Sequence, residues 1–245
     1  MRLDGTDRFL HTSAVVPPAE LEVSEIFQSL QGEGVSAGVP CSFLRLAVCN
    51  LRCGWCDTKY SWDFKNFVYE KEVTQRSVQD VAAELQAVTT RHLVVTGGEP
   101  LLQSDALALL LERLPDFTVE IETNGTIAPA AELARLVQQW NVSPKLGNSG
   151  EPAARRVKLD VLAQFAALPN AWLKLVVADA GCVAEARELA DQAQWPRQRI
   201  LWMPEATSRA QLAARAPEVA KLCVEHGVRF SSRLHLTLFD GKRGT

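Results

Sequence analysis

Short apolar runs along the chain alternate with longer stretches in which apolar residues recur every three or four positions. Val81, Leu85 and Val88 have helical spacing, and Ser77 before them suits a helix N-cap. The same pattern predicts helices over 101–114, 130–138, 183–192 and 208–226. Apolar or alternating runs predict strands in the first part of 21–34 and over 42–48, 92–96, 117–123, 171–177, 200–203 and 228–239.

Strands that alternate with helices of this length indicate βαβ units and a parallel sheet. About six such units are expected, fewer than the eight of a closed (β/α)8 barrel. We therefore predict an α/β protein with a partial (β/α)6, TIM-like barrel, and keep a doubly wound sheet as the alternative. The domain is expected to span 21–245, and the polar stretch 1–20 to form an N-terminal extension; 59–75 mixes aromatic and charged residues and predicts no clear element.

Polar motifs directly follow several of these apolar segments. In a βα barrel, such positions share the rim where active sites are built. The motifs are the cysteine loop 49–56, Gly97-Gly98-Glu99-Pro100, Asn124-Gly125-Thr126, Ser143-Pro144-Lys145 and Met203-Pro204-Glu205. We expect them to converge on one mouth.

The cysteine loop carries Cys49, Cys53 and Cys56 in a C-x3-C-x2-C spacing. Three thiolates on one short loop can converge on a soft metal centre, and iron–sulfur clusters are held by cysteine thiolates. Three ligands on a four-iron cube leave one iron open to bind a small molecule. Structural zinc, which wants four closed ligands, and chance spacing are the alternatives.

The other cysteines predict no metal ligand. Cys41 opens an apolar run and is interpreted as a buried strand residue, although it stays a possible fourth ligand. Cys182 and Cys223 lie far downstream in helical stretches and are interpreted as thiols without a role.

Several polar residues allow both a functional and a structural interpretation. Arg45 lies inside an apolar strand, so it is either paired to a carboxylate or facing a cavity. Glu33, between two glycines, is either a solvated turn residue or a ligand contact. Asp57 and Thr58 either hold Mg²⁺ or cap the next segment.

The glycine pair Gly97-Gly98 allows either a close approach of a ligand to the backbone or a simple turn, and Glu99 beside it can hold an amino group. Asn124 and Thr126 offer short polar contacts. Ser143 and Lys145 can bind a carboxylate or a ribose.

Composition limits the class of partner. The chain of 245 residues is 47% hydrophobic and carries a net charge of −3, so bulk electrostatics do not favour nucleic acid. The charged N-terminus lacks the apolar core of a secretory signal, and no run approaches the roughly 18 apolar residues of a membrane helix. We expect a cytoplasmic protein in a reducing compartment, without a membrane or nucleic-acid partner.

The segment CNLRCGWC followed by GGEP resembles the radical S-adenosylmethionine (SAM) superfamily. Together with EIFQSLQGEG, with FLR before the cysteines and with CDT after them, it resembles the 7-carboxy-7-deazaguanine synthase family from about residue 23 to the end. Two features depart from the family pattern: some twenty residues precede the first motif, and the chain ends in Gly244-Thr245 where members often have a proline.

This resemblance implies a homodimeric partial barrel with a [4Fe–4S] cluster on Cys49, Cys53 and Cys56. SAM on the open iron would accept one electron, from a donor of flavodoxin or ferredoxin type, and yield a 5′-deoxyadenosyl radical. The radical would abstract hydrogen from 6-carboxy-5,6,7,8-tetrahydropterin. Ring contraction with loss of ammonia would give 7-carboxy-7-deazaguanine, a precursor of deazapurines such as queuosine.

The resemblance also implies roles for individual residues. Arg45 would pair with the substrate carboxylate, and Thr58 would ligate a Mg²⁺ that bridges to it. The other substrate contacts would be Leu30, Gln31, Gly32, Glu33, Thr96 and His235, the last expected in the final strand, where a core histidine is the alternative. The SAM contacts would be Trp55, Cys56, Asp57, Gly97, Gly98, Glu99, Asn124, Ser143, Pro144 and Lys145.

Two other classes of protein share parts of this pattern. A radical-generating activase would use the same cluster on a protein partner and would need a broad docking surface. A ferredoxin-like carrier would saturate its cluster with four cysteines, and a zinc ribbon would be far shorter. The buried Arg45 and the SLQGEG segment favour a small acidic substrate.

Overall fold

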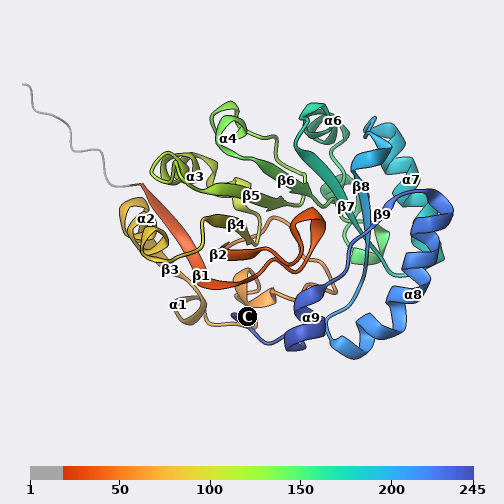
Figure 1. Ribbon diagram of the computed structural model, residues 1–245, viewed down its shortest axis with the longest axis horizontal. Helices are drawn as coiled ribbons and strands as arrows, with labels where there is room; N and C mark the ends of the chain where they lie inside the picture. The colour runs from red at the N-terminus through yellow and green to blue at the C-terminus, as the bar shows by residue number, and fades with distance from the viewer. Residues whose placement is uncertain (1–18) are drawn as a thin grey trace, which may run out of the picture.

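The computed structural model describes residues 19–245, which form one nine-stranded sheet with helices along its outer side (Figure 1). The strand order is β3-β1-β2-β4-β5-β6-β7-β8-β9; β2 and all strands from β4 onward are parallel, whereas β1 pairs antiparallel with β2 and β3. The strands are β1 Glu20–Leu30, β2 Pro40–Leu46, β3 Thr74–Ser77, β4 His92–Gly97, β5 Thr118–Thr123, β6 Gln139–Val142, β7 Ala171–Val177, β8 Ile200–Pro204 and β9 Arg229–Phe230.

Six helices each connect one parallel strand to the next. They are α2 Val78–Ala87, α3 Ser104–Leu111, α4 Ala131–Leu136, α6 Leu159–Ala167, α7 Val183–Gln192 and α8 Arg209–His226, with short helices α1 Tyr69–Glu72, α5 Ala153–Arg156 and α9 Leu234–Phe239 elsewhere. The predicted partial barrel of six βα units is confirmed. Because the parallel strands follow one another in sequence order, the reversal that defines a doubly wound sheet does not occur among the described residues.

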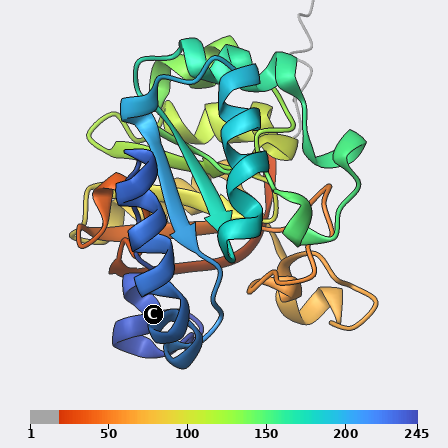
Figure 2. The ribbon, with the colours of Figure 1, turned by 90° about the vertical axis from the view of Figure 1, so that its right-hand side faces the viewer.

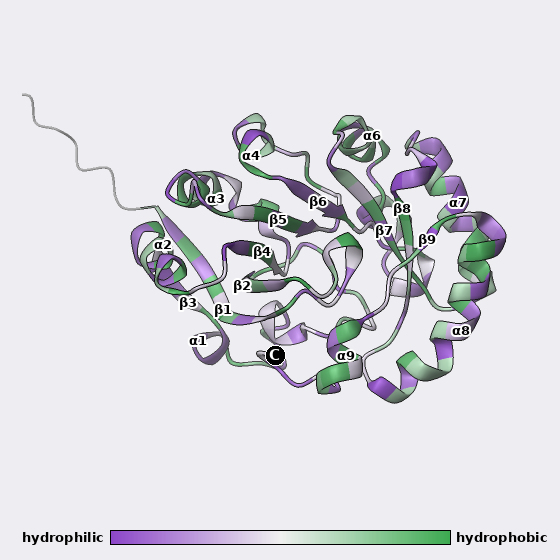
Figure 3. Cartoon of the chain, viewed as in Figure 1, coloured by the Kyte–Doolittle hydropathy of each residue, from purple (hydrophilic) through white to green (hydrophobic). Residues whose placement is uncertain are grey.

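The hydrophobic core lies between the outer face of the strands and these helices. Leu44, Ile121, Trp140 and Leu173 are fully buried there, and the Trp140 ring packs edge-on against Phe165 with centroids 5.3 Å apart. Figure 2 shows α7 and α8 covering β7 and β8, and Figure 3 shows that both helices also carry hydrophilic residues. Most of the buried apolar residues lie in this layer between strands and helices.

The inner face is largely polar, with one small apolar cluster of Cys41, Phe43 and Val94 against Phe27. The Phe27 and Phe43 rings stack with centroids 4.9 Å apart. Cys41 is fully buried, as predicted for a strand residue, and burial raises the pKa of its thiol to about 12.

The expected final strand over 228–239 is wrong beyond Phe230. Only Arg229 and Phe230 pair with β8, and the chain then leaves the sheet and forms α9. The alternation of Leu234, Leu236 and Leu238 imitates a strand, but in the helix only Leu236 is buried. His235 therefore lies on a helix and not in a strand.

Other boundaries moved by a few residues. The helix expected over 101–114 is divided into a 3-10 turn, Pro100–Gln103, and α3, and the helix expected over 130–138 ends at Leu136 because β6 begins at Gln139. Residues 1–18 of the expected N-terminal extension lie outside the described residues, and Glu20 already belongs to β1. No helix in residues 19–245 is long and apolar enough to cross a membrane.

The open side of the barrel, between β9 and β1, is bridged by loops. The Gly34 N–H donates to Ser231 Oγ at 2.8 Å, and the Leu234 N–H donates to the Gly32 carbonyl at 2.8 Å. Residues 231–235, which follow β9 and lead into the first turn of α9, are thereby fixed to residues 32–34, between β1 and β2. We call these contacts the seam of the barrel.

Candidate active site

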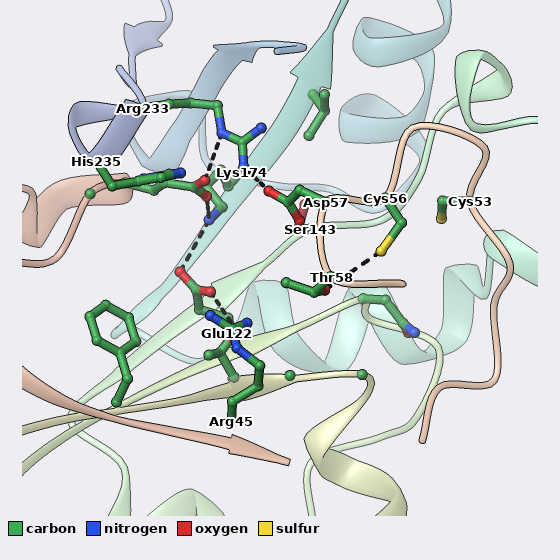
Figure 4. Close-up of a pocket in the computed structure, with 18 of the residues that line it drawn as sticks. Arg45, Cys53, Cys56, Asp57, Thr58, Glu122, Ser143, Lys174, Arg233 and His235 are labelled. Atoms are coloured by element: carbon green, nitrogen blue, oxygen red, sulfur yellow. Dashed lines mark hydrogen bonds and ion pairs between the residues drawn. The ribbon is translucent and has the colours of Figure 1, made fainter. Parts of the chain in front are cut away.

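One pocket opens at the carboxyl ends of the parallel strands, where the sequence predicts convergence of the polar motifs (Figure 4). Its lining brings together residues from the cysteine loop, the β1–β2 loop, the inner strand faces and α9. The predicted site residues in it are Leu30, Gln31, Gly32, Glu33, Arg45, Cys49, Cys53, Trp55, Cys56, Asp57, Thr58, Thr96, Gly97, Gly98, Asn124, Ser143, Lys145 and His235. Glu99 and Pro144 do not line it.

The three cysteines of the loop are free thiols that face this pocket. The Leu51 N–H donates to Cys49 Sγ at 3.4 Å, a bond that favours the thiolate form of Cys49, and Trp62 Nε1 donates to Cys56 Sγ at 3.2 Å. Burial raises the pKa of the Cys49 thiol to about 11 and that of Cys53 above its usual value. With their pKa raised, Cys49 and Cys53 lose their protons when a metal centre binds to them.

The donor chemistry of the loop fits an iron–sulfur cluster. Within residues 19–245, no three His, Cys, Asp or Glu side chains lie close enough together to bind one metal ion. In a four-iron cube each thiolate binds a different iron, so three thiols hold the cube and one iron stays open. A closed structural zinc needs four ligands, whereas this loop supplies three free thiols.

The backbone of the cysteine loop is held by two arginines and a carboxylate. Arg52 donates to the Leu51 carbonyl at 2.9 Å and to the Cys49 carbonyl, and Arg155 donates to the Asn50 carbonyl at 2.7 Å. The Arg52 N–H donates to Glu151, and the Gly54 N–H donates to the Ser149 carbonyl at 2.9 Å. The loop is thereby fixed before any cofactor binds.

The glycine pair of GGEP serves mainly the packing of the backbone. A Cβ at Gly97 would lie 2.0 Å from the Leu46 carbonyl oxygen, and one at Gly98 would lie 1.9 Å from that of Val48. The end of β4 therefore runs against the chain that leads into the cysteine loop, and only glycine fits. Both residues also line the pocket, and a close approach of a ligand to their backbone stays a prediction.

Glu99 lies behind the pocket wall, fully buried. Its carboxylate accepts hydrogen bonds from the Asn124 N–H at 2.7 Å, Thr123 Oγ1 at 2.8 Å and the Leu101 N–H at 3.1 Å. Burial raises the pKa of this carboxyl. Glu99 joins the end of β4 to the end of β5, and so holds the Asn124 loop in place.

Arg45 meets both of the alternatives that its sequence context allows. Its Nε donates to Glu25 Oε2 at 2.9 Å, and its side chain lines the pocket on the inner face of β2. Tyr60 also donates to Glu25 Oε2, at 2.9 Å. A carboxylate therefore compensates the charge of this partly buried arginine while the guanidinium stays next to the pocket.

Lys174 and Glu122 belong to the site and were missed by the sequence reasoning. Lys174 Nζ, on β7, lies 2.5 Å from Glu33 Oε2 and 3.3 Å from Glu122 Oε1 on β5 (Figure 4). Thr96 Oγ1 donates to Glu122 Oε2 at 2.8 Å. The signal was present, because Lys174 interrupts the apolar run of β7 just as Arg45 interrupts that of β2.

Glu33 is not the solvated turn residue of the structural interpretation. Burial alone would raise the pKa of this carboxyl, but Lys174 and then Arg233 hold it well below its usual range. Arg233, a second missed residue, donates through Nε to Glu33 Oε1 at 2.9 Å. Glu33 is therefore an ionised, partly buried carboxylate at the pocket wall.

A second carboxylate, that of Glu120, lies on the inner face of the sheet beneath the pocket. Glu120 is fully buried and accepts hydrogen bonds from Gln31 Nε2 at 2.6 Å and from Ser36 and Asn141, and His92 Nε2 lies 3.0 Å away. Gln31, predicted as a substrate contact, is thus fixed from below. The inner face is a connected polar layer and not a second apolar core.

His235 and Thr58 lie on opposite sides of the mouth. A Cβ at Gly32 would lie 2.2 Å from His235 Nδ1, so the absence of a side chain at Gly32 admits the imidazole. Burial lowers the pKa of His235. Thr58 Oγ1 lies 3.6 Å from Cys56 Sγ and makes no capping hydrogen bond to the 3-10 turn that follows it, Lys59–Ser61, so its hydroxyl is available to the pocket.

The comparisons with known proteins agree with this arrangement. A partial (β/α) barrel with a C-x3-C-x2-C loop at its rim defines a radical SAM protein, and the family model "Radical SAM superfamily" matches residues 45–147. Such a protein binds a [4Fe–4S] cluster and SAM, and the solved Streptococcus suis SuiB bound to S-adenosylmethionine shares the fold, with a TM-score of 0.52 at 13% identity over 76% of this chain and 48% of that one.

Two relatives narrow the class further. The 7-carboxy-7-deazaguanine synthase of Pyrobaculum aerophilum is 39% identical over 91% of this chain and 97% of its own length, and that of Halobacterium salinarum is 38% identical over 90% and 91%. The crystal structure of QueE from Escherichia coli superposes with a TM-score of 0.67 at 28% identity, covering 88% of this chain and 95% of that one. The chain belongs to the 7-carboxy-7-deazaguanine synthase family.

Proposed function

We propose that this protein converts 6-carboxy-5,6,7,8-tetrahydropterin to 7-carboxy-7-deazaguanine with loss of ammonia, as a step of queuosine or other 7-deazapurine biosynthesis. The observation that carries the proposal is the composition of the pocket. One wall holds the cysteine loop, and the other holds a balanced set of buried or partly buried cations and carboxylates. Such a wall suits a small, polar, acidic molecule, and a protein substrate would need a broad surface instead.

The inner-face charges define how the substrate binds. Arg45 binds the substrate carboxylate, since an arginine pairs with a carboxylate through two parallel hydrogen bonds. Gln31, Gly32 and Glu33 contact the ring from the β1–β2 loop, together with Leu30, Thr96 and His235. Glu33 and Gln31 are supported by Lys174 and Glu120, so their polar atoms are fixed before binding.

The cluster-side residues hold SAM. Trp55, Cys56 and Asp57 from the cysteine loop, Gly97 and Gly98 from β4, and Asn124, Ser143 and Lys145 from the following strand ends line that part of the pocket. When bound, the cluster supplies the electron that splits SAM and releases the radical that abstracts hydrogen. Glu99 acts from behind the wall by fixing the Asn124 loop, whereas Pro144, also predicted as a SAM contact, does not line the pocket.

Further components of the proposal are a Mg²⁺ ion, the assembly and the electron donor. Thr58 ligates the Mg²⁺ next to the substrate carboxylate, supported by a hydroxyl that caps no helix. The protein works as a homodimer in the cytoplasm, with a flavodoxin- or ferredoxin-type donor. These components follow from the family resemblance.

An anaerobic reconstitution tests the function. The protein is loaded with iron and sulfide, mixed with SAM, Mg²⁺, dithionite and 6-carboxytetrahydropterin, and the products are followed by mass spectrometry. We expect 7-carboxy-7-deazaguanine from the wild type and none from Cys53→Ala, which loses one ligand of the cluster. Release of 5′-deoxyadenosine without a deazapurine would reject this substrate, and failure to take up iron would reject the cluster.

A further inference from the structure

Arg233 lies on the seam and donates hydrogen bonds to three separate segments of the chain. Its Nε donates to Glu33 Oε1 at 2.9 Å, its Nη2 to Asp57 Oδ2 and its Nη1 to the Ala206 carbonyl (Figure 4). Arg233 is 9% exposed, so its guanidinium lies largely out of water, whereas the Asp57 side chain that it binds is 40% exposed. All three guanidinium nitrogens are therefore engaged at once.

Two of the residues that Arg233 binds lie on opposite sides of the pocket. Asp57 directly follows Cys56 and lies on the loop that holds the cluster. Glu33 lies on the β1–β2 loop, on the side where the substrate binds, and is itself held by Lys174. Arg233 is thus a direct bridge between the cofactor side and the substrate side.

We propose that Arg233 is a positioning residue that sets the separation between the two sides of the pocket, so that SAM cleavage and hydrogen abstraction stay coupled. The inference rests on the proposed function and deepens it. Hydrogen transfer needs the reacting atoms in a near-attack arrangement, and a displacement of about 1 Å can cost on the order of 100-fold in rate. Without the bridge, SAM is still cleaved, but the radical more often fails to reach the substrate.

The seam does not depend on this side chain alone. The backbone bond from Leu234 to Gly32 and the bond from Gly34 to Ser231 both remain when Arg233 is replaced. Glu33 keeps Lys174, and the Asp57 side chain, 40% exposed, can turn to solvent. We therefore expect Arg233→Gln to fold and to bind the cluster.

The test compares two products in the same anaerobic assay: 5′-deoxyadenosine and the deazapurine. For Arg233→Gln we expect product formation to fall about 10- to 100-fold while 5′-deoxyadenosine release falls much less, so their ratio rises at least several-fold. Iron content and the electron paramagnetic resonance signal of the reduced cluster with SAM should match the wild type. Arg233→Lys, whose single ammonium cannot reach three partners, should recover the ratio only in part.

Arg215 offers a matched control. It also ties a loop at this end of the barrel, donating to Glu205 Oε1 at 2.9 Å and to the Glu205 carbonyl at 2.7 Å, but it does not line the pocket. We expect Arg215→Gln to keep the wild-type ratio. A raised ratio in this variant as well would mean that any loosened loop uncouples the reaction, and would overturn the specific role of Arg233.

Asp57→Asn separates coupling from folding. If Arg233 acts through Asp57, this single variant also raises the ratio, and the double variant with Arg233→Gln is no worse than the more severe single one. Asp57 also lines the SAM side of the pocket, so this variant is assayed at saturating SAM. Under that condition it carries the test alone if Arg233→Gln does not fold. Equal losses of both products, or an unchanged ratio, would overturn the proposal, whereas a wild type that releases 5′-deoxyadenosine and makes no deazapurine would instead overturn the proposed function.

Discussion

The outer and inner faces of the same parallel strands differ in nearly every physical property. Outward residues such as Leu44, Ile121 and Trp140 pack against helices with no exposure, whereas inward neighbours such as Arg45, Glu122 and Lys174 carry charge. Successive side chains in a strand point to opposite faces, so one strand serves both. The difference suggests that the outer face contributes most of the stability and that the inner face contributes the chemistry.

The largest effect is expected on the outer face, from Trp140→Ala. The indole is fully buried against Phe165, so its removal leaves a cavity and should lower the free energy of unfolding by about 3–5 kcal/mol. Denaturant unfolding measures this loss, with Val224→Ala on the exposed side of α8 as a control near zero. Turnover per folded, iron-loaded molecule should stay at the wild-type value; a matching loss of turnover would break the division.

On the inner face, Arg45→Ala should keep the cluster and SAM cleavage and lose substrate turnover. A hydrogen bond to a charged group is worth about 1.5–3 kcal/mol, which corresponds to a kcat/KM roughly 10- to 100-fold lower. Steady-state assays with 6-carboxytetrahydropterin measure it. Arg91→Ala, just before β4 where the arginine stacks on Phe117, is the matched control. Normal turnover by Arg45→Ala would remove its assigned role.

The smallest effect concerns pH and His235. Burial lowers the pKa of this histidine below the usual value of 6.5. Below about pH 6.5 the histidine is therefore protonated more readily in the unfolded chain than in the folded protein. Stability should therefore be fully present above about pH 6.5 and fall below it, by at most about 1.4 kcal/mol per pH unit from this group. Thermal unfolding between about pH 7.5 and about pH 5.5 should show a shallower dependence in His235→Gln. An identical slope would show that the pKa of His235 is the same in the folded and the unfolded protein.

The outer face is what made the fold predictable. Apolar residues at strand and helix spacing gave the order of the elements, and Ser77 and Ser208 cap α2 and α8 as N-caps do. The final segment was mistaken because its alternation satisfied the strand pattern locally. In the structure, Arg233 donates hydrogen bonds to Glu33 and Asp57, and the Leu234 N–H donates to the Gly32 carbonyl. These contacts with residues some 170 to 200 positions earlier hold the segment away from the sheet.

The site was predictable where a motif carried it. The cysteine loop and Gly97-Gly98 line the pocket, as do Asn124, Ser143 and Lys145 from the strand ends, and Glu99 fixes the Asn124 loop. Thr126 and Glu205, from the same predicted motifs, do not line it. Lys174, Glu122 and Arg233 follow no motif, and their partners are visible only when distant strands come together. The criterion that identified Arg45, a single charged residue within an apolar strand, also identifies Lys174. No feature of the neighbouring sequence identifies Arg233.

The contact between Gly32 and His235 has a consequence for sequence variation. Any Cβ at position 32 would overlap the imidazole, 2.2 Å from Nδ1, so the two positions are sterically exclusive. A lineage that gains a side chain at position 32 must shrink or displace the residue at position 235, and the two changes should be inherited as a pair. Across related chains we expect these positions to covary, although about 200 residues separate them in the sequence.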